Sequence, residues 1–201
     1  MSGFYEETKG IYRLRVPFKN IYTSVFLIMS EENKILVDCG TTAYDVDSVI
    51  IPSLSELGYT LSDLNMLVLT HHHGDHAGGL ARIREIVPNI SVITDICEIF
   101  EMASTYALPG HTEDSIGILD ERTGTLISGD GLQGAGVDKY RCYTKEPDKY
   151  IETIEKIKND ERIENILFSH AYEPWNKDFI SGREDVLKCL SDCIKYSGGK
   201  K

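Results

Sequence analysis

The part of this sequence that most constrains its fold and chemistry is a run of histidines directly after a short apolar stretch. Residues 65–70 read NMLVLT, which is typical of a buried β-strand, and residues 70–79 read THHHGDHAGG. Four of the six histidines in the chain therefore lie within six consecutive positions, together with one aspartate. Because a strand holds the loop at its end rigidly, polar side chains there commonly build a binding site. Imidazole and carboxylate groups are the usual zinc ligands, so the segment predicts a metal site.

The candidate ligands of this segment form two pairs. His71 and His73 stand two residues apart at the end of the predicted strand, where both can face one ion. Asp75 and His76 follow at the start of a predicted helix and supply a second, adjacent pair. One tight metal site needs three or four ligands, whereas this segment alone supplies four in two orientations, which favours two neighbouring ions. His72 alternates away from these residues, and we expect it to point outward with a structural role.

Glycines surround these candidate ligands. We expect Gly74 to let the backbone turn after the strand. We expect Gly78 and Gly79 to allow a neighbouring stretch of backbone to approach closely, because glycine has no Cβ.

The other elements follow from apolar spacing and turn residues. Pro52 interrupts one helical pattern, so that helix is expected to begin irregularly. Interleaved strands and helices indicate an α/β layered fold. The predicted strands are 11–16, 23–29, 34–38, 65–70, 91–94, 115–119, 125–128 and 165–169, and the predicted helices are 45–57, 76–87, 147–158 and 179–196.

Three further polar residues stand at predicted strand ends. Asp38 follows KILV, Asp130 follows LISG and His170 follows ILFS. In layered sheet folds, the loops at strand ends commonly form the site because the sheet fixes their positions. We therefore expect these three side chains to converge with the histidine cluster on one site.

The chain resembles the metallo-β-lactamase superfamily in five ordered motifs. HHHGDH fits the H-x-H-x-D-H motif of that family, and VDCG places Asp38 like its first motif aspartate. PGHTEDS, SGDG and SHAY place His111, Asp130 and His170 like the histidine, aspartate and histidine of its later motifs. The motifs span residues 38–170, most of the chain. The resemblance implies a four-layer αββα sandwich, formed by a single domain of this type over residues 1–201.

The same resemblance implies a dinuclear centre with two divalent metal ions, zinc being favoured and iron or manganese being alternatives. A hydroxide that bridges two dications is a nucleophile at neutral pH, because each ion lowers the pKa of bound water. Asp75 is also a candidate to take a proton from that water. The implied ligands are His71, His73 and His111 for one ion and Asp75, His76 and His170 for the other, with Asp130 contacting both.

Tyr172, in SHAYEPW just past His170, is the candidate to line an acyl pocket or to donate to an oxyanion. Ordinary packing of a half-buried aromatic residue is an equal alternative for this side chain.

The composition of the chain indicates which kinds of partner the protein can bind. The 32 acidic and 21 basic residues give a formal net charge of −11, which opposes nucleic acid because binding there depends on lysine and arginine. The N-terminus has no apolar signal region, and the longest apolar run, VFLIM at 25–29, is too short to cross a membrane. Five irregularly spaced cysteines indicate reduced thiols. We expect a cytoplasmic protein without nucleic-acid or membrane partners.

Within the family, the sequence resembles the glyoxalase II, thioesterase and lactonase branch. An aspartate at position 130 is unlike the true β-lactamases, which lack that bridge. Two departures are that only about one helix follows residue 178, and that Gln133 stands where lactonases carry a tyrosine. The predicted function is hydrolysis of a small-molecule thioester, lactone or other carboxylic ester.

Two other functions stay open from the sequence. One is a persulfide dioxygenase-like oxidoreductase with a single iron, which the seven filled ligand positions disfavour. The other is a metal-binding protein without turnover. The oligomeric state is also open, with a homodimer among the options.

Overall fold

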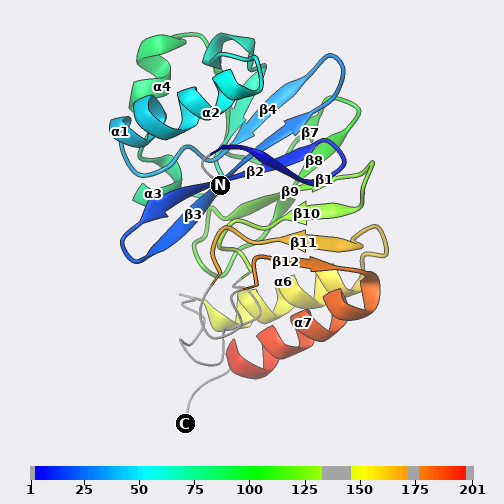
Figure 1. Cartoon of the computed structure of the whole chain (residues 1–201). Coiled ribbons are helices and arrows are strands. Elements are labelled where there is room, and N and C mark those ends of the chain that lie inside the picture. Colours follow the sequence, from blue (N-terminus) through cyan, green and yellow to red (C-terminus); the bar gives the residue numbers. More distant parts are fainter. Residues whose placement is uncertain (1–2, 133–145, 172–176, 198–201) are drawn as a thin grey trace. The chain divides into compact units, whose positions relative to one another are not determined.

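The computed structural model describes residues 3–132, 146–171 and 177–197, and the chain divides into two compact units. The first unit comprises residues 1–94 and the second residues 95–201. Each unit contains one mixed sheet of six strands together with its own helices (Figure 1). No helix in the described ranges is both long and apolar enough to span a membrane. The expectation of a single domain over residues 1–201 stays a prediction.

The sheet of the first unit has the strand order β1-β2-β3-β4-β5-β6. Strands β1 to β4 pair antiparallel, whereas β5 joins β4, and β6 joins β5, in parallel. The β2–β3 hairpin keeps one register from Ile11 opposite Ile28 to Phe18 opposite Ile21. The strands are β1 Tyr5–Thr8, β2 Ile11–Phe18, β3 Ile21–Met29, β4 Lys34–Val37, β5 Met66–Val68 and β6 Ser91–Ile93.

The helices of the first unit lie in its two parallel crossovers. Their apolar residues, including Val46, Leu54 and Ile83, form one buried cluster with Leu14 and Leu67 of the sheet. Figure 1 shows α1, α2 and α4 grouped beside this sheet. Between β4 and β5 lie α1 Ala43–Asp45, the π-helical turn η1 Val46–Ile50, α2 Ile51–Glu56 and the 3-10 turn η2 Leu61–Asp63, and between β5 and β6 lie α3 Gly74–Ala77 and α4 Leu80–Ile86.

The irregular helix predicted for residues 45–57 is confirmed, because the π-helical turn η1 precedes Pro52 and divides the segment. The single helix predicted for residues 76–87 is wrong. It is divided into α3 and α4 because the carbonyl oxygen of His76 accepts hydrogen bonds from the backbone N–H of Cys39, at 2.8 Å, and from the Cys39 thiol, at 3.2 Å. That carbonyl is therefore directed to the neighbouring loop instead of continuing a regular helix.

The sheet of the second unit has the strand order β12-β11-β10-β9-β8-β7. Strands β7 to β10 pair antiparallel, β10 and β11 pair in parallel, and β12 closes the edge antiparallel to β11. The strands are β7 Glu98–Ile99, β8 Ala103–Ala107, β9 Ile116–Asp120, β10 Thr125–Ile127, β11 Asn165–Leu167 and β12 Phe179–Ser181.

Two long helices of the second unit, α6 Pro147–Asn159 and α7 Arg183–Ser197, pack side by side (Figure 1). The helix predicted for residues 179–196 is wrong at its start, since Phe179–Ser181 is strand β12 and Ile180 pairs with Ile166. Gly182 separates the two elements at φ = +93°, a conformation that favours glycine. Leu190 of α7 and Tyr150 of α6 belong to the buried apolar cluster of this unit.

The two units repeat one strand plan. In each, three antiparallel pairings of consecutive strands precede a parallel crossover, from β4 to β5 and from β10 to β11. The residue after β4 hydrogen-bonds to the end of β5 in the same way as the residue after β10 hydrogen-bonds to the end of β11. Asp38 N–H donates to Val68 O and Ser128 N–H donates to Leu167 O, both at 2.9 Å. His71 lies three residues after Val68, and His170 lies three residues after Leu167, so the two histidines occupy equivalent positions. The candidate ligands thus follow equivalent strand ends in both units.

Candidate metal centre

Asp38 organises the first unit's part of the site. It is fully buried directly after β4, and its backbone has φ = +61°, a left-handed conformation that only a few residues other than glycine tolerate. Its Oδ1 accepts the Thr70 backbone N–H at 2.8 Å, and its Oδ2 lies 2.9 Å from Thr70 Oγ1 and 2.7 Å from His76 Nδ1. This carboxylate therefore joins the ends of β4 and β5 and fixes the orientation of the His76 ring.

The hydrogen bond to Asp38 also assigns the tautomer of His76. A carboxylate accepts a proton, so Nδ1 of His76 carries the hydrogen and Nε2 keeps its lone pair for a metal ion. Carboxylate partners of this kind are typical behind histidines that bind metal.

His71 and His73 form a close pair beside His76. The His71 Nε2 and His73 Nδ1 atoms lie 3.0 Å apart, and the rings of His71 and His76 have centroids 4.2 Å apart. Two ligand atoms on one tetrahedral zinc ion lie about 3.3 Å apart, given Zn–N bonds of about 2.0 Å. The spacing of the two ring nitrogens therefore fits two ligands of one ion.

Asp75 is held by a residue that lies 52 positions earlier in the sequence. Its Oδ2 accepts a hydrogen bond from Thr23 Oγ1 of β3 at 3.0 Å and lies 3.5 Å from His76 Nε2. Thr23 is fully buried, whereas the Asp75 side chain is 14% exposed. The carboxylate of Asp75 and the ring of His76 thus lie side by side, and their role as metal ligands stays a prediction.

The glycines of the histidine segment differ in their roles. A Cβ at Gly78 would overlap the Thr41 carbonyl oxygen, and one at Gly79 would overlap the Cys39 carbonyl oxygen, so the predicted close approach of backbone is confirmed at both. Gly74 begins α3 at a position where a Cβ would meet nothing within 4 Å, and it is not among the glycines with positive φ. The chain does turn into α3 at Gly74, but this turn needs no positive φ and leaves room for a Cβ.

The second unit brings together the other three predicted ligands. Asp130 lies between two histidines, with Oδ2 3.6 Å from His111 Nε2 and Oδ1 3.2 Å from His170 Nε2. These three side chains are buried. Each carboxylate oxygen thus has its own histidine partner, at the spacing expected between two ligands of one ion.

His72 and Tyr172 are the remaining residues with predicted roles. His72 is exposed, which confirms the expectation that it points outward. Tyr172, Gln133 and Trp175 lie outside the described residues, so the predicted role of Tyr172 stays a prediction.

Thr23 and Thr70 were not predicted from the sequence as residues of the site. Thr70 immediately precedes the histidine segment, but its bond to Asp38 needs the pairing of β4 with β5. Nothing in the sequence around Thr23 signals its contact with Asp75, 52 positions away.

The metallo-beta-lactamase superfamily profile matches residues 20–95, which contain the histidine segment. The crystal structure of the metallo-β-lactamase FIM-1 from Pseudomonas aeruginosa in its mono-zinc form aligns with 96% of this chain and 94% of its own, with a TM-score of 0.73 at 17% identity. The chain thus carries a segment similar to this superfamily and has the metallo-β-lactamase fold. The prediction of an α/β fold of metallo-β-lactamase type is confirmed.

Among similar proteins, a hydroxyacylglutathione hydrolase of Vibrio campbellii is 31% identical over 163 residues. That alignment covers 67% of this chain and 63% of the relative. The beta-lactamase-like protein 2 homolog of Caenorhabditis elegans is 28% identical over 165 residues, or 71% of this chain and 54% of the relative. The chain therefore spans less than two thirds of the length of both relatives.

Proposed function

We propose that this protein is a metal-dependent hydrolase of thioesters or related carboxylic esters with a dinuclear metal centre. The observation that carries the proposal is the Asp130 carboxylate, whose two oxygens face two different histidines at 3.6 and 3.2 Å. A carboxylate that presents one oxygen to each of two ligand groups is suited to contact two ions. The first unit adds two further pairs of donor groups, His71 with His73 and Asp75 with His76.

In the proposed centre, the ligands are those that the resemblance to the family implies. His71, His73 and His111 would hold one ion, Asp75, His76 and His170 the other, and Asp130 would contact both. Histidine nitrogens and carboxylate oxygens suit zinc, and they also accept iron or manganese. When bound, the two ions would supply a hydroxide that is nucleophilic at neutral pH and would polarise the acyl oxygen.

The chain's own residues would prepare this chemistry. Asp38 keeps the hydrogen of His76 on Nδ1, which leaves Nε2 as the ligand atom. Thr23 donates to Asp75 Oδ2 and so fixes the orientation of that carboxylate. Asp75 is the proposed acceptor of the proton that the attacking water loses.

Support for an acyl substrate comes from the relatives. The Vibrio campbellii relative is named a hydroxyacylglutathione hydrolase, which indicates a thioester-cleaving branch of the superfamily. Because the aligned region covers 63% of that relative, the proposal extends to the acyl-transfer chemistry and not to recognition of glutathione.

Elemental analysis of protein purified without chelator or added metal tests the proposal, together with hydrolysis assays on acyl thioesters and lactones. We expect about two zinc-class ions per chain and metal-dependent hydrolysis. His71→Ala and Asp130→Ala should each lose both metal and activity. His72→Ala is the matched control, since this exposed histidine lies inside the same segment and should keep both.

Other outcomes would replace the proposal. One iron per chain with oxygen uptake on persulfides would indicate the dioxygenase instead. Full metal content without turnover on any acyl substrate would indicate a binding protein. A chain that holds no metal after reconstitution would contradict a metal centre altogether.

A further inference from the structure

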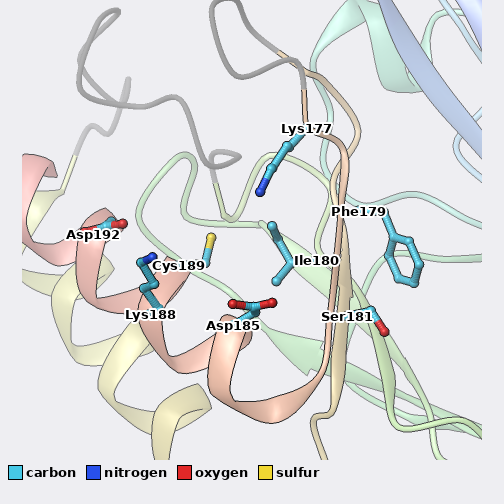
Figure 2. A pocket seen from close by; sticks show the side chains of 8 residues that line it. All are labelled: Lys177, Phe179, Ile180, Ser181, Asp185, Lys188, Cys189 and Asp192. Atoms are coloured by element: carbon cyan, nitrogen blue, oxygen red, sulfur yellow. The ribbon is translucent and has the colours of Figure 1, made fainter.

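A cavity of about 260 Å³ lies in the second unit, between β12 and α7. It is lined by Lys177, Phe179, Ile180, Ser181, Asp185, Lys188, Cys189 and Asp192. Figure 2 shows Ile180 on the side of β12 that faces α7, with the Cys189 sulfur and the Lys177 ammonium directed toward the space beside it. The cavity contains none of the proposed metal ligands, so its chemistry is separate from the proposed hydrolysis.

Cys189 has a second thiol beside it. Cys193 follows four residues later on α7, which places both side chains on the same face of the helix. Both cysteines are buried thiols, with 5% of Cys189 and 1% of Cys193 exposed. Because Cys189 lines the cavity, a small molecule that enters it can reach this sulfur without unfolding of the helix.

The surroundings favour the thiolate form of Cys189. A hydrogen bond from the Cys193 side chain lowers the pKa of the Cys189 thiol below its ordinary value, and the Lys177 ammonium acts in the same direction. Burial and the Asp192 carboxylate oppose this shift without cancelling it. By contrast, burial raises the pKa of the Cys39 thiol, which keeps that cysteine in its unreactive form.

We propose that Cys189 is a nucleophilic thiol that low-molecular-weight disulfides modify inside this cavity, with Cys193 as the residue that positions and activates it. Cys189 first releases its proton to solvent. Its thiolate sulfur then forms a bond to one sulfur of the disulfide, whose S–S bond breaks, and the leaving thiolate takes the electron pair. Cys189 is thereby oxidised to a mixed disulfide, and one half of the reagent is reduced to a thiol.

The mixed disulfide is the expected end product. Residues four apart on a helix have Cβ atoms about 5–6 Å apart, whereas a disulfide needs about 3.5–4.5 Å. Attack by Cys193 on the modified Cys189 would therefore require α7 to distort. Cys193 acts as a hydrogen-bond donor and not as the second sulfur of a disulfide.

The test is the reaction of the full-length folded protein with dithiodipyridine, a small neutral disulfide whose released thione absorbs light. We expect Cys189 to react first and to carry one thiopyridyl group, as identified by peptide mass spectrometry. Cys193→Ala should slow the reaction of Cys189 by about 3- to 10-fold, because the thiolate fraction falls. Cys193→Ser is the matched control and should retain most of the rate, since a hydroxyl also donates a hydrogen bond.

Lys177→Gln should also slow the reaction, whereas Lys177→Arg should not. The midpoint of thermal unfolding, measured for each variant, separates these effects from loss of folding. Reaction of Cys189 only at the rate of global unfolding would overturn the proposal. An equal rate in the Cys193→Ala and Cys193→Ser variants would overturn the activating role of Cys193.

Discussion

At the scale of single residues, Thr23 is a buried residue that contacts a proposed ligand directly, because its Oγ1 donates to Asp75 Oδ2 at 3.0 Å. Thr23→Val keeps the shape of the side chain and removes this donor. Loss of a hydrogen bond behind a metal ligand typically lowers metal affinity by about 10- to 100-fold, and we expect that loss here. Competition with a chelator of known affinity measures it. Thr23→Ser restores the hydroxyl and should restore the affinity, and equal affinity in the Val and Ser variants would contradict the positioning role.

Two variants of Asp38 separate the contribution of its hydrogen bonds to stability from the cost of its left-handed backbone conformation. Asp38→Asn tolerates φ = +61° but replaces the charged acceptor of Thr70 and His76, so we expect a loss of about 2–3 kcal/mol in the free energy of unfolding. Asp38→Ala loses the acceptors and also adds about 1–2 kcal/mol of left-handed strain. Urea unfolding of both variants measures these losses. Equal losses in the two would show that the backbone strain at 38 costs nothing.

At the scale of elements, the junction of α3 and α4 depends on close contact with the loop after β4. Gly78→Ala would push a methyl group into the Thr41 carbonyl oxygen, and we expect a loss of about 3 kcal/mol in unfolding free energy. Gly74→Ala is the matched control, because open space surrounds that position on the same short helix. Its stability should stay equal or rise by up to about 1 kcal/mol. Thermal unfolding of the two variants distinguishes overlap with the Thr41 carbonyl oxygen from an effect of helix propensity. Equal losses of stability in both variants would show that this overlap is not the cause.

Helices and strands were predictable where the apolar spacing of the sequence agrees with the pairing that the segment makes in the fold. The strands that became β2, β3 and β4 and the helix that became α6 follow directly from apolar spacing. Strand β12 was predicted as helix because its three residues continue the apolar spacing of α7, and only pairing with β11 makes them a strand. The division of α3 from α4 was missed because it depends on Cys39, 37 positions before His76.

The end of α6 gives a pH-dependent prediction. Hydrogen bonds from the Arg162 side chain hold the pKa of Asp160 below its ordinary value of 3.8, with Oδ2 at 2.7 Å from Arg162 Nη2. A depressed pKa stabilises the fold above the unfolded-state value, and the contribution is lost as the pH falls through the folded-state value. Asp160→Asn should therefore cost about 0.5–1 kcal/mol at neutral pH and less at an acidic pH below 3.8.

Urea unfolding at the two pH values checks this prediction. Glu161→Gln is the control, since Glu161 is the exposed neighbour of Asp160 and has no ion pair within the described ranges. A deficit in Asp160→Asn that persists in acid would show that the ion pair is not its cause.

At the scale of the whole molecule, the two units place candidate ligands after equivalent strands. His71 follows β5 and His170 follows β11, each at the end of a parallel crossover, and Asp38 and Asp130 follow β4 and β10. His71, Asp130 and His170 were predictable because they stand at strand ends that apolar runs reveal, whereas His111 was predicted only from the resemblance to the family. The residues that orient the ligands were not predictable, because Thr23 and Asp75 meet only once the sheet has formed.

This arrangement predicts how metal affects stability. If the proposed ligands hold metal, metal binds only the folded chain and should raise its unfolding temperature in proportion to the logarithm of the free metal concentration. Removal of metal with a chelator should lower that temperature. Differential scanning calorimetry measures both effects. Asp130→Asn should behave like the chelated protein even with metal present. An unfolding temperature that does not respond to metal would contradict a metal centre in the folded chain, whatever the activity on esters.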